Sequence, residues 1–231
     1  MQSKTFGTLI GSFGKGIKGS VTVNFGVSGG ANCSDECTLK GNGCYAITTE
    51  AVKPSITVNL ERKQNNLTQY LTELTSPKAL AKLNAAPWIR ASAFGSIPAP
   101  EQVTDEQYSL FKDLANGITN EHLHWPVETL DKARLLRSVG FNPRYSAGLD
   151  VDKCISAVIQ GFNTSLVVEG PKKARGKNKR KYSEPAFIAM KDLTSQGIKS
   201  KVCPAIAGSA SCGACTLCAD KNIDVIIYPM H

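Results

Sequence analysis

The sequence predicts an α/β protein, folded as a partial, open barrel of about six βα units, (βα)6, with a cysteine-rich C-terminal segment. Short segments rich in β-branched residues alternate with amphipathic helical segments, which favours a mostly parallel sheet. The chain has 231 residues, whereas a complete eight-unit barrel typically needs about 250. Its composition, 42% hydrophobic and 20% charged, is ordinary for a globular protein.

We expect a single domain over residues 1–231. A flexible N-terminal arm is predicted at 1–20, the partial barrel at 21–202, and a cysteine-rich metal-binding segment with a closing strand at 203–231. No apolar run approaches the roughly 20 residues that a membrane span needs. The N-terminal residues lack the continuous apolar region of a signal peptide, so the expected location is cytoplasmic.

Seven segments have the residue types of β-strands, and most of them precede a helical pattern. The first strand runs directly into a loop with three cysteines. The predicted strands are 21–26, 88–97, 118–125, 144–147, 166–169, 198–202 and 223–228.

Helices are predicted from apolar spacing and from capping residues. Leucine and tyrosine side chains at i, i+3, i+4 and i+7 mark an amphipathic helix over 67–74. Thr104 and Gln107 form a T-x-x-Q capping box at the start of another. Further helices are expected near 77–83, 129–139, 152–159 and 185–196.

The C-terminal cysteines have the spacing C-x8-C-x2-C-x2-C. Successive x2 intervals are typical of the run that holds three corners of a cubane cluster, whereas zinc ribbons use two separate C-x2-C pairs. The spacing therefore favours [4Fe–4S] over zinc, with zinc as the alternative. The predicted ligands are Cys203, Cys212, Cys215 and Cys218.

The N-terminal cysteines, Cys33, Cys37 and Cys44, follow the first strand with the spacing C-x3-C-x6-C. Chemistry in parallel α/β folds is placed at the carboxyl ends of strands, and three thiolates leave one iron open for a ligand. Three other arrangements remain open: a zinc site closed by a fourth ligand, one metal shared with the C-terminal cysteines, and disulfides. Cys154 is expected to be a small buried hydrophobe. His122 and His124 are expected to form a hydrogen-bonded polar pair at a strand end.

The formal net charge of +8 is concentrated in a predicted basic loop at 171–184. Without the seven cations of this loop the charge falls to +1. Such a run is either a solvated loop or a contact for nucleic acid phosphates, and its concentration favours the contact. The candidate residues are Lys172, Lys173, Arg175, Lys177, Lys179, Arg180 and Lys181.

The segments CSDECTLKGNGCYA and CPAIAGSASCGACTLC, with the final strand VIIYPMH, resemble radical-SAM-like iron–sulfur proteins encoded by phages and other mobile elements. The resemblance implies a radical-SAM-type partial barrel. It also implies that Cys33, Cys37 and Cys44 hold a [4Fe–4S] cluster, which cleaves S-adenosylmethionine reductively to a 5′-deoxyadenosyl radical. The C-terminal cysteines would hold an auxiliary cluster.

Two functions follow as hypotheses. The first is a phage- or plasmid-type iron–sulfur protein, radical-SAM-like, that acts on or binds nucleic acid. The second is a non-catalytic protein stapled by zinc or by an iron–sulfur cluster, which engages nucleic acid or a host or mobile-element protein complex through its basic loop. The residues leave open whether the chain is an enzyme.

Overall fold

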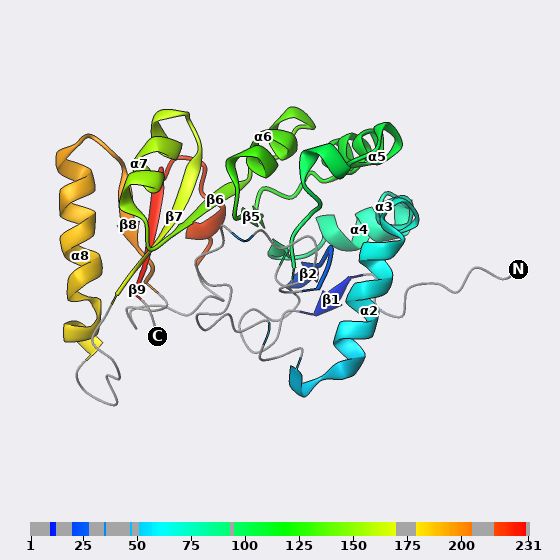
Figure 1. Ribbon diagram of the computed structural model, residues 1–231, viewed down its shortest axis with the longest axis horizontal. Coiled ribbons are helices and arrows are strands. Elements are labelled where there is room, and N and C mark those ends of the chain that lie inside the picture. The colour runs from blue at the N-terminus through cyan, green and yellow to red at the C-terminus, as the bar shows by residue number, and fades with distance from the viewer. Residues whose placement is uncertain are drawn as a thin grey trace, which may run out of the picture.

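The structure is a computed structural model that describes residues 10–12, 20–27, 35, 47, 51–92, 95–169, 179–204 and 215–229, with backbone only at 11–12 and 179–183. Nine strands and seven helices lie within these residues and form an α/β fold with mainly parallel sheets (Figure 1), which confirms the predicted α/β class.

The first sheet has the order β1-β2-β3-β4. Its strands are β1 (Gly11–Ser12), β2 (Val21–Val23), β3 (Ile89–Ala91) and β4 (Leu123–His124). β1 pairs antiparallel with β2, and the other pairs are parallel.

The second sheet is wholly parallel, with the order β5-β6-β7-β9-β8. Its strands are β5 (Pro126–Val127), β6 (Arg144–Gly148), β7 (Asn163–Val168), β8 (Ser200–Val202) and β9 (Val225–Pro229). Only Trp125 separates β4 from β5, and its carbonyl accepts the backbone N–H of Arg144 at 2.9 Å. The last strand, β9, lies between β7 and β8.

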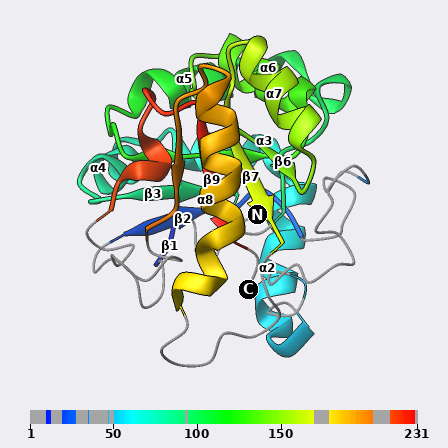
Figure 2. The same cartoon turned by 90° about the vertical axis from the view of Figure 1, so that its left-hand side faces the viewer.

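Seven helices cover the sheets (Figures 1 and 2). They are α2 (Pro54–Asn65), α3 (Leu67–Leu74), α4 (Pro77–Asn84), α5 (Asp105–Gly117), α6 (Leu130–Ser138), α7 (Val151–Ile159) and α8 (Lys179–Ser195). The predicted capping box starts α5: the Thr104 hydroxyl accepts from Gln107 N–H, and the Gln107 side chain accepts from Thr104 N–H, each at 3.2 Å.

The main core lies between the helices and one face of the sheets. Phe25 stacks on Trp125 with ring centroids 5.0 Å apart, and Phe111 packs against both rings. Cys154 is fully buried in this core, and burial raises the pKa of its thiol to about 12. The prediction that Cys154 is a buried hydrophobe is confirmed.

The opposite face of the second sheet carries a different set of residues, and we call it the inner face. Side chains alternate along β9, so Val225 and Ile227 join the main core while Ile226 and Tyr228 point the other way. Ile226 packs there with Cys203, near Leu217 and Cys218. Figure 1 shows α8 and the 3₁₀ turn η3 (Leu217–Ala219) on opposite sides of this sheet.

Several predicted strands were longer than the observed ones, and the strand expected at 21–26 ends at Val23. The strand expected at 88–97 ends at Ala91, because Ser92 has a φ of +51° and donates its N–H to Val23 O at 2.7 Å. The strand expected at 118–125 begins only at Leu123. Before this strand, the side chain of Asn120 donates hydrogen bonds to Leu83 O and Ala86 O, which fixes the chain against the end of α4.

Two helix predictions also need correction. No helix was expected at 54–65, where α2 lies. α8 begins at Lys179 and continues through Pro185, so the predicted basic loop is wrong for residues 179–184. A proline inside a helix removes one backbone hydrogen bond, and here the helix continues on both sides of it. None of the described helices is both long enough and apolar enough to span a membrane.

Candidate metal centre

Three of the seven predicted metal-ligand cysteines lie in the described part of the chain. Cys203 directly follows β8, and Cys215 and Cys218 lie just before and within η3. The other four, Cys33, Cys37, Cys44 and Cys212, fall outside the described residues. Within the residues described, no three His, Cys, Asp or Glu side chains are grouped as a metal site.

The sheet itself positions Cys203. Its backbone N–H donates to Ile227 O at 2.8 Å, which continues the β8–β9 pairing by one residue. The side chain is 6% exposed and packs with Ile223 and Ile226 on the inner face. A thiol that follows β8 is therefore directed to the same face as η3.

Arg144 holds the segment around Cys218 against the inner face. This side chain is only 3% exposed and makes five hydrogen bonds to backbone carbonyls. Nε donates to Cys218 O at 3.1 Å; the two terminal nitrogens donate to Thr164 O, Asp220 O and, twice, Ile223 O at 3.0–3.3 Å. Five donors is the full capacity of a guanidinium. Arg144 thus joins β6, β7 and the cysteine-rich segment.

His124 reaches the same carbonyl from the first sheet. Its Nδ1 lies 3.1 Å from Cys218 O, and because a carbonyl only accepts, Nδ1 carries the proton. Its ring stacks on Trp88 with centroids 6.1 Å apart. Burial, with the charges of Arg90 and Arg144, holds the pKa of His124 well below its usual value, so the imidazole is neutral.

The expected pairing of His122 with His124 does not describe the structure. His122 is exposed and lines a surface hollow of about 360 Å³ together with Thr216 and Asp220, whereas His124 is buried. No local sequence pattern could place His124 beside a cysteine, because Cys218 lies 94 residues further along the chain.

Tyr228 is the third polar contact of Cys218. Its hydroxyl lies 3.1 Å from Cys218 Sγ. Burial raises the pKa of the Cys218 thiol; the Tyr228 hydrogen bond and the charges of Arg144 and Arg90 act in the opposite direction. Without a metal the buried thiol is protonated near neutral pH, and a metal that binds there must displace the proton. The surrounding cations suit the negative charge that thiolate ligands bring.

A second polar cluster lies at the carboxyl end of β5. Glu128 accepts hydrogen bonds from Ser96 Oγ at 2.7 Å and from Lys132 Nζ at 2.5 Å. The side chains of Lys132 and Glu128 are 4% and 11% exposed. This cluster ties the loop after β3 to the first turn of α6, and no sequence pattern had indicated it.

The carboxyl end of β2, which leads toward the first cysteine segment, is covered by α2. Gln64 Oε1 accepts the backbone N–H of Val27 at 3.2 Å. The ammonium of Lys63 lies 4.7 Å from the centroid of the Tyr70 ring. Lys63 is 3% exposed, and burial lowers the pKa of its ammonium from 10.5 to about 8.

Because of Lys63, the free energy of unfolding should change with pH in the alkaline range. Below pH 8 the Lys63 ammonium is charged in both the native and the unfolded state. Between pH 8 and 10.5 the native state releases this proton whereas the unfolded state keeps it. The free energy of unfolding therefore rises with pH over this range, by up to about 3 kcal/mol. We expect the difference in free energy of unfolding between Lys63→Met and the wild type to favour the variant at pH 7 and to shrink by pH 9.5. Urea unfolding at several pH values measures it, with the exposed Lys112→Met as control. A pH-independent difference would contradict the expectation.

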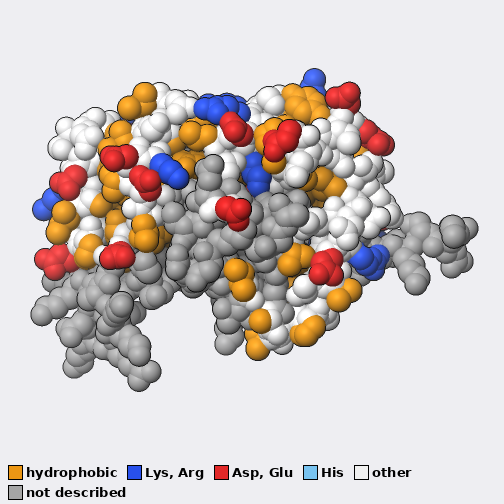
Figure 3. Space-filling model, viewed as in Figure 1, with side chains coloured by type: hydrophobic (Ala, Val, Ile, Leu, Met, Phe, Trp, Pro, Cys, Tyr) orange, Lys and Arg blue, Asp and Glu red, His pale blue; other side chains and the backbone are white. Residues whose placement is uncertain are grey.

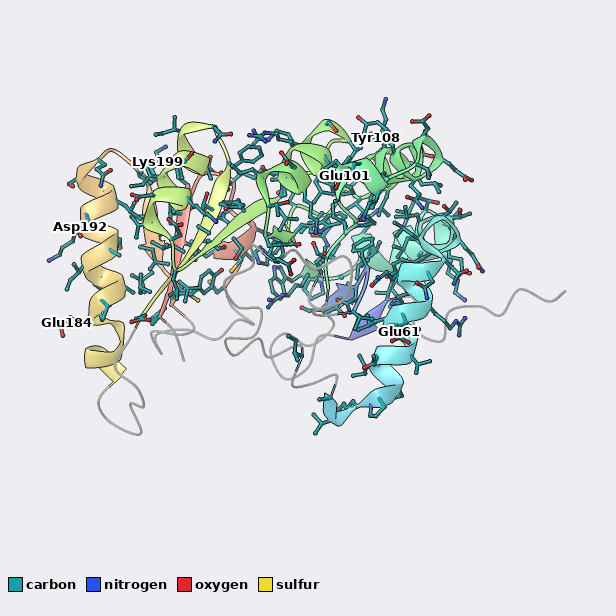
Figure 4. All side chains as sticks on the ribbon, viewed as in Figure 1. Glu61, Glu101, Tyr108, Glu184, Asp192 and Lys199 are labelled. Carbon is teal, nitrogen blue, oxygen red and sulfur yellow. The ribbon has the colours of Figure 1, made fainter. Side chains whose placement is uncertain are left out.

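The predicted nucleic-acid residues lie at the start of α8 or before it, and their side chains fall outside the description. Beyond them, α8 carries Glu184, Lys191 and Asp192; Figure 4 shows the two acidic side chains pointing away from the sheet. On the face seen in Figure 3, the coloured charged side chains of both signs are interspersed. The described part of α8 therefore does not extend the basic run.

The fold and the site together define an α/β protein whose second, parallel sheet carries Cys203 and Cys218 on its inner face beside the buried Arg144. Comparison with protein-family models, with curated proteins and with solved structures finds no match. The resemblance to radical-SAM-like proteins therefore stays a prediction.

Proposed function

We propose that this chain is an iron–sulfur protein with a radical-SAM-like partial barrel. The observation that supports it best is the placement of Cys203 and Cys218 on the inner face, away from the main core. The Tyr228 hydroxyl lies against the Cys218 sulfur, and this hydrogen bond and the charges of Arg144 and Arg90 act to lower the pKa of the thiol, as an anionic metal–thiolate centre requires. In this proposal Cys203, Cys212, Cys215 and Cys218 hold one [4Fe–4S] cluster.

The strand order supports the partial barrel. From β2 to β7 the strands follow one another in chain order, and they are parallel within each sheet. The passage from β4 to β5 through Trp125 joins the two sheets along one path. Only β8 and β9 are exchanged. The first cysteine segment leaves the carboxyl end of β2, where parallel α/β proteins place their chemistry.

The reactive cluster in this proposal is held by Cys33, Cys37 and Cys44. When bound, it would supply the electron that cleaves S-adenosylmethionine. Nucleic acid is the proposed partner, contacted by the cations at 172–181, and the reaction would take place on or beside it.

Metal analysis and S-adenosylmethionine cleavage test the proposal on protein purified without oxygen. We expect about eight irons per chain for two clusters and about four for one. After dithionite reduction, release of 5′-deoxyadenosine is expected for the wild type and absent for Cys33→Ala, Cys37→Ala and Cys44→Ala. Cys154→Ala is the matched control, because that thiol lies in the main core, and it should keep both metal and activity.

A second candidate function is that of a non-catalytic, metal-stapled binding protein. Arg144 supports it, because its hydrogen bonds to the backbone of the cysteine-rich segment have a structural role that requires no catalysis. A colourless protein with stoichiometric zinc and no cleavage would favour this metal-stapled binding protein. The nucleic-acid part is tested separately: neutralising the seven cations at 172–181 should flatten the salt dependence of binding. An unchanged slope would remove nucleic acid as the partner of that segment.

A further inference from the structure

The hydroxyl of Tyr228 is held in place by the sheet. Tyr228 lies in β9, which pairs with β7 on one side and β8 on the other, and its register partner in β7 is Val167. The side chain reaches across the inner face to η3, where its oxygen lies 3.1 Å from Cys218 Sγ. Because β9 has a neighbour on both sides, the position of the hydroxyl does not depend on the cysteine-rich segment alone.

The direction of this hydrogen bond follows from the chemistry of a metal ligand. A metal-bound cysteine is a thiolate and has no proton to donate. The hydroxyl must then be the donor, in an O–H···S⁻ bond. Hydrogen bonds to cluster sulfurs withdraw charge from the ligands, and they are among the features that set the reduction potential of an iron–sulfur cluster.

Arg144 also contacts Cys218, but at its backbone carbonyl and not at its sulfur. All its donors are used on carbonyls, so it contributes charge and anchoring without a hydrogen bond to the sulfur. His124 is bound to the Cys218 carbonyl as well. Among the described residues, Tyr228 alone has a hydrogen bond to this sulfur.

We propose that Tyr228 is a positioning residue that donates a hydrogen bond to the Cys218 thiolate and raises the reduction potential of the C-terminal cluster. The inference rests on the proposed function, because it requires that Cys218 binds metal. It adds a residue that neither the cysteine spacing nor the resemblance identifies.

Tyr228→Phe removes the hydroxyl and keeps the ring. We expect the variant to keep its full iron content. In a redox titration followed by electron paramagnetic resonance, its equilibrium constant for one-electron reduction should be about tenfold smaller, which makes the reduction potential about 59 mV more negative. Tyr108→Phe is the matched control, because its hydroxyl hydrogen-bonds to Ser138 on α6, far from the site (Figure 4). An iron-loaded Tyr228→Phe protein with the wild-type potential would overturn the inference and leave the proposed function standing.

A zinc-loaded protein would give a second readout. Without the hydroxyl the thiolate is more easily protonated, so Tyr228→Phe should release zinc to a chelator several-fold faster than the wild type; equal rates would overturn the inference. Should Tyr228→Phe not fold, Tyr228→Leu, which keeps an apolar side chain and has no hydrogen-bond donor, is expected to give the same shift. A wild-type chain that binds neither metal would overturn the inference and the proposed function together.

Discussion

Replacing Arg144 by methionine is expected to destabilise the protein by about 3 kcal/mol or more. Methionine fills a similar volume but removes the guanidinium donors from the carbonyls of Thr164, Asp220 and Ile223, and it leaves Cys218 O with His124 as its remaining side-chain donor. These groups are buried or partly buried, so the lost hydrogen bonds are only partly replaced by water. Denaturant unfolding measures the change.

The same variant should also weaken metal binding at the proposed centre. Because Arg144 docks the segment that carries Cys218, its loss is expected to lower the metal content and to make Cys218 react faster with a thiol reagent in the metal-free protein. Arg144→Lys should be intermediate, since an ammonium has three donors in place of five.

Arg134→Met is the matched control. Arg134 pairs with Asp131 on the surface of α6 and its side chain is 53% exposed. Exposed pairs of this kind contribute less than about 1 kcal/mol, so this variant should keep both stability and metal. Equal effects of the two arginine substitutions would contradict the anchoring role of Arg144.

Replacing Gly95 by alanine should cost about 3 kcal/mol or more, for two reasons that act together. Gly95 has a φ of +59°, which disfavours any residue with a Cβ. A Cβ there would also lie 2.9 Å from Gly26 Cα and overlap the Gly26 carbonyl. Backbone atoms cannot move aside as a flexible side chain would, so the loop after β3 must separate from the carboxyl end of β2.

Gly197→Ala separates the two causes. Gly197 also has a positive φ, +79°, but no heavy atom lies within 4 Å of a Cβ there. Its cost should be about 1 kcal/mol, from the backbone conformation alone. Thermal and denaturant unfolding of both variants test this, and similar costs would show that the close approach to Gly26 is unimportant. The Gly95 variant is also expected to lose S-adenosylmethionine cleavage while it keeps the metal bound by the C-terminal cysteines. The reason is that the contact between Gly95 and Gly26 lies at the end of β2, which leads to the first cysteine segment.

Elements with a local signal were predicted well. The apolar stripe of α3 and the capping box of α5 depend on residues a few positions apart, and the structure contains both. The helix α2 was missed because its sequence, PSITVNLERKQN, has no clear apolar stripe, and only Leu60 and Lys63 are buried in it. The predicted strand 88–97 was too long because apolar residues continue past Ser92, where the backbone turns.

The cysteine clusters illustrate the same division. Their spacing along the chain predicts a metal site, which stays a prediction, whereas the placement of Cys154 in the core is confirmed. Arg144, His124 and Tyr228 come from β6, β4 and β9, and no local pattern links them to Cys218. A charged residue at the start of a buried strand was the one available signal for Arg144.

By itself, the sequence determined the α/β class, most helices and the thiols available for a metal, because periodicity, capping and cysteine spacing are local properties. Only the tertiary structure decided the exchange of β8 and β9 and the set of residues around Cys218. Those features depend on which strands become neighbours, and strand pairing is set by the burial of whole faces between residues far apart in the chain. The environment of the sulfur, which governs its charge and its metal chemistry, is therefore a property of the folded sheet.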